Sequence, residues 1–550
     1  MGNTTRLQLL FVVLAVAWGS PLPPVPSLYF PSALAAEPPL ANTGHKGLKA
    51  KTIDDMLKLP EEEIDVGMAA LLVAKECDAK VHVQEDLARL DRVAREIRIR
   101  LGAHEKPKEV IKLINEHLFT RLGYSFQKKE EDTRCNCLHH VLATGRGGCA
   151  GLSALYLSIG ERLGLPVHGV CVPTHAFIRY ETGDRAINVD PALMGRSLPD
   201  AAYVRLWGVP ETTRSKQFVM VSLSKRQWLG VLLNCSGKRC IAEGRLAKGV
   251  DALERSLALE RNDSTTWGGL ACAYYTQQAY DKCIEAARES LQIDPGDTYV
   301  LCRLGLAYGE TRDWERAAKV FEEATAADPR DSAKWNNLGW AYMNQNRFGE
   351  AARAFEKALA LDPRAAKALG NMGLLHLKQS EYAKAAEPLA RSVSLDPKNA
   401  VVWEWLGDAY RHIGKRDQAI SAYREAVQRQ PDNVDSWLGL AGLYSKAGEM
   451  DKAVPAWERA ASQTPPPRES VLWLIPAYLE RGSAQKAVAL LRRAVAAYPQ
   501  DEDMWNLMVL ALCAAGDADA ARACVRKCRA NGIQVFDYVL DVLRQMADEP

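Results

Sequence analysis

Within the first 200 positions, one cysteine, one histidine and one aspartate stand in an order and a setting that suit thiol acyl transfer. Cys149 follows the glycine-rich run GRGG, His175 follows Pro-Thr, and Asp190 ends the run INVD. In such chemistry a cysteine thiolate attacks an acyl carbon, a histidine accepts and returns the proton, and a carboxylate orients the imidazole. The order Cys, His, Asp therefore predicts a catalytic set in which Cys149 forms a thioester.

The sequence around Cys149 predicts a sharp turn followed by a helix. Gly145, Gly147 and Gly148 permit the turn, and ALYLSIGERLGLP predicts a helix that ends near Gly164. A thiol at a helix N-terminus lies at the positive end of the helix dipole, and a nearby imidazolium favours the thiolate further. For Cys149 alone, the alternative is an unreactive cysteine at a tight corner.

Short runs rich in β-branched and aromatic residues follow this helix and predict a small antiparallel sheet. The runs are VHGVCV (167–172), HAFIRY (175–180) and RAINV (185–189). ETGD separates the last two, which predicts that Tyr180 pairs with Arg185. That register places His175 opposite Asp190, with Cβ atoms about 4.5–5.5 Å apart, whereas a one-residue slip would put them on opposite faces.

The segment GGCAGLSALYLSIGERLGLPVHGVCVPTHAFIRY, followed by INVDP, resembles the transglutaminase-like family, in particular its bacterial SirB-type branch. The resemblance covers roughly residues 63–245 and is most specific over residues 149–191. It implies a papain-like α+β fold, to which tetratricopeptide repeats are appended in some members. Matched residue by residue, it implies Cys149 as nucleophile, His175 as base and Asp190 as orienting acid.

Three further features near this segment have weaker chemical interpretations. Asn136 is either an oxyanion donor or a helix cap. The run CNCLHH (135–140) contains metal-ligand types, but zinc sites usually separate their ligand pairs by longer spans, so it is better explained as a helix start. Cys171 is the rival thiol. We expect neither a metal nor a cofactor.

The second half of the chain carries a repeat of 34 residues. Proline stands at positions 295, 329, 363, 397, 431, 465 and 499. Six residues after these prolines come Leu301, Trp335, Leu369, Trp403, Trp437, Val471 and Trp505. The pattern resembles the tetratricopeptide repeat, in which stacked pairs of short amphipathic helices bury a shared core. It predicts eight units over residues 264–535, with the first helix of the seventh interrupted by Pro476.

The first helices of such a solenoid line a concave face. Positions expected on it are Cys272, Leu306, Trp340, Leu374, Asp408, Gly442, Pro476 and Leu510. Most are apolar or small, and no basic row able to clamp a carboxylate is present. The pattern predicts a groove that docks a protein or peptide, of which Leu306, Trp340, Leu374, Asp408 and Leu510 are the candidate contacts. A structural brace is the alternative.

The N-terminus predicts export. A charged start is followed by the apolar run LQLLFVVLAVAW (7–18), which is too short to span a bilayer, and by the small-residue site Ala33-Leu34-Ala35. These features predict a signal peptide over residues 1–35, a mature chain that begins at Ala36, a periplasmic location and no membrane span after cleavage. An uncleaved membrane anchor is the alternative.

Charge and cysteine content limit the remaining possibilities. The 70 basic residues nearly balance the 68 acidic ones, so we expect no nucleic-acid partner. The cysteines number 13, an odd count that leaves at least one unpaired in the monomer. Cys235 and Cys240 are the best disulfide candidates, whereas Cys283 and Cys528 occupy positions where other repeats carry alanine and are expected to pack in the core.

The expected architecture is mainly α. After the signal peptide come a linker (36–62), an α+β papain-like transglutaminase-like domain (63–215), connecting helices with a degenerate repeat (216–263), eight tetratricopeptide repeats forming an α-solenoid (264–535), and a capping helix and tail (536–550). The expected function is exported, thiol-dependent acyl transfer: amide or peptide hydrolysis, deamidation or isopeptide transfer on a docked partner. The alternative is a non-catalytic interaction scaffold with an inactive front domain.

Overall fold

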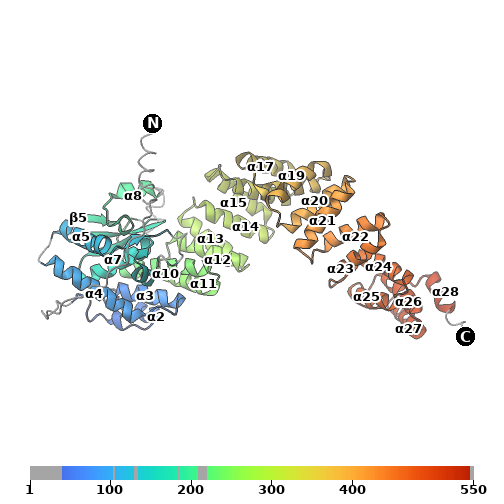
Figure 1. The fold of residues 1–550 in the computed structure, drawn as a ribbon, viewed down its shortest axis with the longest axis horizontal. Helices are drawn as coiled ribbons and strands as arrows, with labels where there is room; N and C mark the ends of the chain where they lie inside the picture. The colour runs from blue at the N-terminus through green and yellow to red at the C-terminus, as the bar shows by residue number, and fades with distance from the viewer. Residues whose placement is uncertain are drawn as a thin grey trace. The chain divides into compact units, whose positions relative to one another are not determined.

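The computed structural model describes residues 40–102, 106–128, 134, 136–172, 174–183, 185–207 and 220–545. It is mainly helical, with two small sheets in the N-terminal half (Figure 1). Its contacts define two compact units. The first contains the described parts of residues 1–128, 137–169 and 177–197, and the second those of residues 129–136, 170–176 and 198–550. The predicted signal peptide and its cleavage site lie outside the described residues. Among the described helices, none is long and apolar enough to cross a membrane.

The first unit is built around one buried helix. Its helices include α3 (Val66–Cys77), α4 (Val83–Leu101), α5 (Pro107–Asn115), η3 (Glu116–Arg121), α6 (Leu138–Thr144) and α7 (Cys149–Leu163). Helix α7 contacts α3, α4 and α6, and all its residues except Cys149 and Glu161 are buried. Along α4, residues spaced three or four apart form an apolar stripe, and all of them are buried: Leu87, Leu90, Ala94, Ile97 and Leu101.

The three predicted strands are present, but their register differs from the prediction. The strands β3 (Val167–Val172), β4 (His175–Thr182) and β5 (Arg185–Val189) lie in that order in one sheet. Thr182, rather than Tyr180, pairs with Arg185, so the hairpin loop has two residues instead of four. Gly183 has a φ of +51°, which permits this tighter turn. Continued one step beyond Val189, the observed register aligns Asp190 with Phe177 instead of His175. The observed and predicted registers thus differ by two residues, and an even difference leaves each side chain on the predicted face of the sheet.

The segment predicted as a linker, residues 36–62, is not a free connector where it is described. It contains η1 (Lys46–Lys49), α2 (Ile53–Leu57) and η2 (Glu61–Glu63). Thr52 and Asp55 form a reciprocal capping box that begins α2. The three-residue spacing of Ile53 and Met56 places both on one face, and both are fully buried. Residues 40–62 therefore belong to the first unit.

The eight predicted repeats are eight helix pairs in the second unit. They are α12 (Ser264–Thr276) with α13 (Tyr280–Ile293), α14 (Thr298–Glu310) with α15 (Trp314–Ala327), α16 (Ser332–Asn344) with α17 (Phe348–Leu361), α18 (Ala366–Lys378) with α19 (Tyr382–Leu395), α20 (Ala400–His412) with α21 (Arg416–Arg429), α22 (Val434–Lys446) with α23 (Met450–Ala461), α24 (Arg468–Glu480) with α25 (Ala484–Ala497), and α26 (Glu502–Ala514) with α27 (Ala518–Ala530). The helix α28 (Asp537–Gln545) follows and packs on α26 and α27.

A recurring hydrogen bond explains the spacing of proline and tryptophan. The indole Nε1 of Trp335 donates to the backbone oxygen of Pro329, six residues earlier, over 3.0 Å. Equivalent bonds of 2.9–3.0 Å join Trp403 to Pro397, Trp437 to Pro431 and Trp505 to Pro499. Each tryptophan thus ties the start of its helix to the loop before it.

The degenerate repeat predicted before the eight units is the pair α10 (Lys225–Ala242) and α11 (Leu246–Leu259). In it the Ser256 hydroxyl donates to the backbone oxygen of Gly230 over 2.8 Å. Ser290, 34 residues further on, makes the same 2.8 Å bond to Ser264 within the first full repeat. The pair α10–α11 therefore follows the register of the solenoid.

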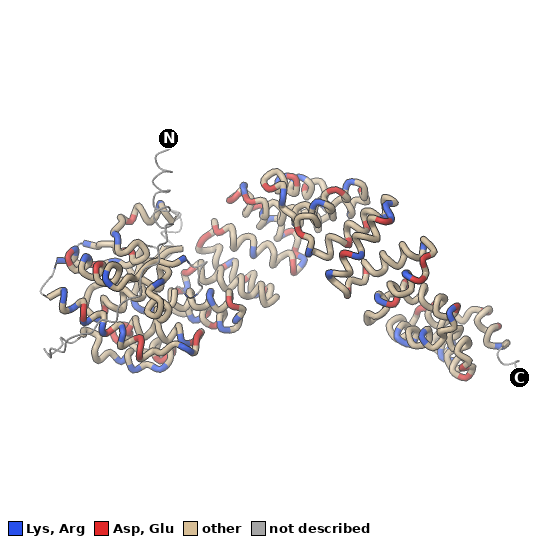
Figure 2. The backbone as a smooth tube through the Cα atoms, viewed as in Figure 1, with Lys and Arg blue, Asp and Glu red and all other residues tan. Residues whose placement is uncertain are grey.

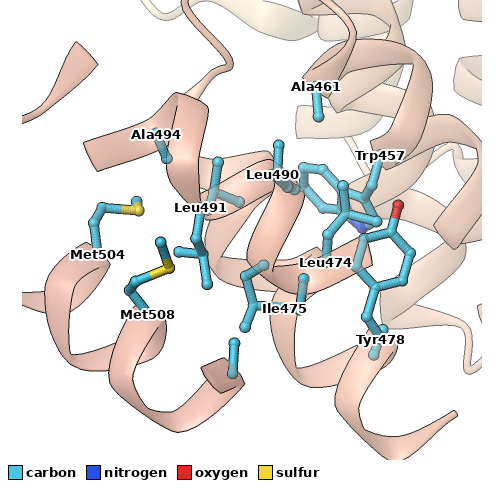
Figure 3. Close-up of a cluster of buried hydrophobic side chains, with 14 of the residues drawn as sticks. Trp457, Ala461, Leu474, Ile475, Tyr478, Leu490, Leu491, Ala494, Met504 and Met508 are labelled. Atoms are coloured by element: carbon cyan, nitrogen blue, oxygen red, sulfur yellow. The ribbon is translucent and has the colours of Figure 1, made fainter. Parts of the chain in front are cut away.

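Two local predictions in the second unit are wrong. Pro476 does not interrupt α24, which is continuous and packs Leu474, Ile475 and Tyr478 into the core shown in Figure 3. The packing of these neighbours outweighs the single backbone donor that proline lacks. Cys235 and Cys240 lie five residues apart on the unbroken helix α10, and no disulfide joins them.

Candidate active site

Cys149 lies where a fixed turn meets the start of a buried helix. It is the first residue of α7, with Gly148 as N-cap, and it is partly exposed. The turn is held by β1 (Ser125–Phe126), which pairs with β2 (Arg146–Gly147). On either side of that pairing, the Ser125 N–H donates to the Gly145 oxygen and the Gln127 N–H to the Gly147 oxygen, over 2.9 and 2.8 Å. The predicted turn and helix are confirmed.

Asp190 lies in the first unit with Cys149. It follows β5, is fully buried and caps η4 (Pro191–Leu193), with its Oδ1 accepting the Ala192 N–H over 3.0 Å. Its own N–H donates to the backbone oxygen of Arg196 over 3.0 Å. Because η4 contacts α7, the segment that carries Asp190 packs against the helix that begins with Cys149.

His175 begins β4 and lies in the second unit, beside two aromatic rings that the sequence did not reveal. Its side chain is buried, and its ring stacks on Trp207 with centroids 4.2 Å apart and planes 9° apart. Tyr203, which is fully buried on α8 (Asp200–Leu206), lies 6.2 Å away in a parallel orientation. Tyr203 and Trp207 are four residues apart, a spacing that puts both rings on one face of a helix. This spacing was the signal in the sequence that could have identified the pair.

The complete triad remains a prediction. Cys149 and Asp190 belong to the first unit, whereas His175 belongs to the second. The segment that carries Asp190 packs against the helix that begins with Cys149, whereas the His175 ring is oriented by its stacking on Trp207.

The residues with weaker predictions are also accounted for. Asn136 does not cap α6, because the N-cap is Cys137; its buried Oδ1 makes no hydrogen bond to any described residue. Cys135 is outside the described residues. The two histidines of CNCLHH have separate partners: His139 Nδ1 is 2.6 Å from Asp86 Oδ2, and His140 Nε2 is 3.4 Å from Gln127 Oε1. The rival thiol, Cys171, lies on β3 and is partly exposed.

The predicted groove positions all retain some exposure. Pro476 is exposed, and Cys272, Leu306, Trp340, Leu374, Asp408, Gly442 and Leu510 are partly exposed. Asp408 is also structural, because its Oδ1 accepts the Tyr423 hydroxyl over 2.6 Å and an Arg411 N–H over 2.9 Å. Burial and the Asp408 carboxylate raise the pKa of Tyr423. Basic and acidic residues are interspersed along the repeats in Figure 2.

Some exposed aromatic residues on the first helices were missed. Arg303 lies over the rings of Tyr275 and Tyr299, at 4.9 and 5.4 Å from their centroids. Trp473 is half exposed and stacks on the buried Trp457. These positions vary in type from one repeat to the next, so the 34-residue pattern did not single them out.

Comparison with protein families supports the two-part architecture. Residues 84–234 match the model of the transglutaminase-like superfamily. Residues 264–297, 302–352, 336–400 and 406–467 match tetratricopeptide repeat models. Residues 445–533 also match the model of the bacterial transcriptional activator domain.

Two curated relatives match a short part of the chain. They are UPF0162 proteins of Xylella fastidiosa strains Temecula1 and 9a5c, each 34% identical over 93 residues. The match spans 17% of this chain and 33% of each relative, so the chain covers about a third of their length. This likeness supports the SirB-type branch.

Several solved structures align with part of the chain. MamA is 24% identical over 31% of this chain and 92% of its own, with a TM-score of 0.28. Pseudomonas aeruginosa PilF is 21% identical over 38% and 96%, with a TM-score of 0.35. PilW, a type IV pilus biogenesis factor, is 23% identical over 38% and 98%, with a TM-score of 0.36. Scores this low support no argument about function.

Proposed function

We propose that this chain, in which a transglutaminase-like domain precedes tetratricopeptide repeats, is an exported thiol-dependent acyl-transfer enzyme that docks a protein partner on its solenoid. The observation that carries the proposal is the position of Cys149. It is the partly exposed first residue of an otherwise almost fully buried helix, after a turn fixed by backbone hydrogen bonds. This position leaves the residue partly exposed and places its thiol at the positive end of the helix dipole.

The proposed reaction has two steps. The Cys149 Sγ attacks an amide carbon of the substrate, a thioester forms, and the amine leaves with a proton from His175. Water or a second amine then attacks the thioester and gives its proton to His175. The thiol is restored, and the product is an acid or a new amide. Hydrolysis, deamidation and isopeptide transfer are variants of this one sequence.

Other residues of the site have supporting roles in this proposal. Asp190 orients the His175 imidazole, and the stacked Trp207 restricts the plane of the ring. The negative charge on the tetrahedral intermediate is stabilised by backbone N–H groups at the start of α7, to which the side-chain amide of Asn136 is added. No bound metal or cofactor takes part in these steps.

The solenoid supplies the docking surface in this proposal. Leu306, Trp340, Leu374 and Leu510 present partly exposed apolar surface from first helices, and Asp408 adds a carboxylate. Successive first helices contact one another through most of the array, so these positions form a series along one face. An apolar series with few charges suits a peptide or protein segment with hydrophobic anchors.

Export is proposed from the sequence of the first 35 residues, and the periplasm is the proposed location. N-terminal sequencing of protein recovered from the bacterial envelope should find Ala36 first. A retained Met1 or Gly2 would contradict cleavage and favour a membrane anchor.

The catalytic proposal is tested by competitive alkylation. Iodoacetamide at mildly acidic pH, with peptide-resolved mass spectrometry, should label Cys149 ahead of the other twelve cysteines, because only a stabilised thiolate reacts there. The His175→Ala variant should lose most of this preference. If Cys149 reacts no faster than Cys171, the catalytic assignment is wrong and the scaffold alternative takes its place; the repeat array favours partner binding in either case.

A further inference from the structure

We propose that His45, Asp65 and Glu161 form a binding site for one divalent metal ion in the first unit. One ligand atom of each residue lies within 4.8 Å of those of the other two. The residues come from the segment before η1, the residue before α3 and the last turn of α7. The site is therefore at the opposite end of α7 from Cys149, and the acyl-transfer proposal does not use it.

Close packing and hydrogen bonds hold these segments together. The Ala41 N–H donates to the Arg162 oxygen over 2.9 Å, and the Asn42 amide donates to Asp65 Oδ2 over 2.5 Å. Gly47 lies directly against the backbone near Asp65, because an added Cβ there would be 2.5 Å from the Glu63 oxygen. These contacts fix the backbone on both sides of His45.

The charges of this region favour a cation. Asp65 is fully buried, and the Glu161 side chain is 9% exposed. The Arg162 guanidinium lies between two carboxylates, with Nε 2.6 Å from Asp91 and Nη1 3.7 Å from Asp65. Glu161 is the third carboxylate of this region, and its Oε1 faces His45 Nδ1 at 3.9 Å. Buried carboxylates are costly unless their charge is balanced, and a divalent ion bound by Asp65 and Glu161 would contribute to that balance.

The ligand atoms are arranged for coordination. Backbone N–H groups already hold one oxygen of each carboxylate: Met68 donates to Asp65 Oδ1 over 2.7 Å and Val66 to Glu161 Oε2 over 2.9 Å. Glu161 Oε1 is 3.9 Å from His45 Nδ1, which is buried and makes no hydrogen bond to a described residue. Ligand atoms bound to one ion at about 2.1 Å are roughly 3–3.5 Å apart, so a contraction of under 1 Å would bring this pair into range.

The ligand set identifies the class of ion. One imidazole with two carboxylates suits Mn²⁺ or Zn²⁺, with water completing the coordination. Mn²⁺ is the better probe, because the 13 cysteines of the chain offer competing thiol ligands to Zn²⁺ but not to Mn²⁺.

The test is a Mn²⁺ titration of the full chain after chelator treatment, in which free Mn²⁺ is counted by electron paramagnetic resonance. We expect one equivalent to bind and to raise the melting temperature. His45→Ala, which removes a partly exposed side chain, and Glu161→Gln should each weaken binding at least about tenfold. Zn²⁺ should displace the bound Mn²⁺.

His168→Ala is the matched control, since His168 also faces a glutamate, Glu181 at 3.8 Å, but with both side chains about 40% exposed. It should leave binding unchanged. The absence of a one-to-one binding phase, or equal affinity in the wild type and His45→Ala, would overturn the proposal. A loss of binding in His168→Ala as large as that in His45→Ala would do the same.

Discussion

At the scale of single residues, the ring of His175 has the clearest structural support. Trp207 stacks on it at 4.2 Å, and Tyr203 lies parallel behind. A stacked ring limits rotation of the imidazole about its side-chain bonds. This restriction keeps the imidazole aligned, as a proton-transfer group requires. In the proposed mechanism, Trp207 is a positioning residue.

Replacing Trp207 with alanine should therefore slow iodoacetamide labelling of Cys149 at acidic pH, because a misoriented imidazolium stabilises the thiolate less. Trp207→Phe, which keeps a flat ring, should restore most of the rate. Peptide-resolved mass spectrometry measures both. If the alanine variant labels as fast as the wild type, Trp207 has only a packing role.

His117 allows a pH prediction in the first unit. Its side chain is fully buried, and burial, with Arg121 and Arg100 nearby, lowers its pKa to about 4. The Glu96 carboxylate, 3.2 Å from Nε2, opposes this effect but does not outweigh it. Since the unfolded pKa is near 6.5, the unfolded chain binds more protons between pH 6.5 and 4.

Stability from His117 is thus fully present above pH 6.5 and is lost as the pH falls toward 4, by about 3 kcal/mol at most. His117→Gln should show a smaller loss of the urea midpoint between pH 7 and 4.5 than the wild type. Equal losses in both proteins would show that His117 does not titrate in this range.

Residue types and their order suggested a candidate site but not the surroundings of its residues. The triad of Cys149, His175 and Asp190 remains a prediction, although its members were identifiable as candidates because few chemistries use these side chains in that order. The Trp207 stack was not, since it depends on α8 approaching the start of β4, a contact between segments some 30 residues apart. The carboxylate cluster around Arg162 was missed for the same reason: its members come from three distant segments.

At the scale of elements, the repeats depend on close approach of the two helices in a pair. An added Cβ at Gly339 on α16 would lie 2.6 Å from the ring of Phe355 on α17, which is fully buried. Gly305 and Phe321 have the same relation one repeat earlier. Glycine at this position lets the aromatic ring lie against the backbone of the facing helix.

Gly339→Ala should lower the stability of the solenoid by roughly 1–3 kcal/mol, because the Phe355 ring must move. Gly442→Ala is the matched control: it is also inside a first helix, and nothing lies within 4 Å of the added atom. It should be neutral or up to about 1 kcal/mol stabilising, since alanine favours helix. Urea unfolding followed by circular dichroism compares them, and equal effects would contradict the role of close packing.

Periodicity predicted the elements well because it reflects packing that recurs. The 34-residue spacing yielded all eight helix pairs, and the proline–tryptophan interval corresponds to a real hydrogen bond. The β4–β5 register was wrong because a turn sequence of four residues also accommodates a two-residue loop when Gly183 adopts a positive φ. Pro476 was misjudged because local propensity ignores the tertiary packing of its neighbours.

At the scale of the whole molecule, the proposed function places the chemistry in the front domain and partner selection in the solenoid. Trp340 is the predicted anchor, although it also packs against Trp314 with ring centroids 4.8 Å apart. Trp340→Ala should weaken partner capture by roughly thirtyfold, the equivalent of about 2 kcal/mol, and leave Cys149 labelling unchanged.

Leu374→Ala removes a smaller side chain at the equivalent position of the next repeat, so it should disturb folding less than Trp340→Ala. It should also weaken capture of the partner. Glu356→Ala, exposed on the second helix α17, should not. Pull-down from envelope extract, with melting temperatures checked, measures all three. Capture by both groove variants equal to that of the wild type would make the solenoid a structural brace.

The most direct test of the central claim compares the docked partner after incubation with the wild type and with Cys149→Ala. Proteins captured from envelope extract by each form are analysed by mass spectrometry for new termini, deamidated glutamine and isopeptide bonds. We predict that both forms capture the same partner, and that one of these changes is present with the wild type and absent with Cys149→Ala. A partner captured equally and chemically identical in both samples would contradict acyl transfer at Cys149.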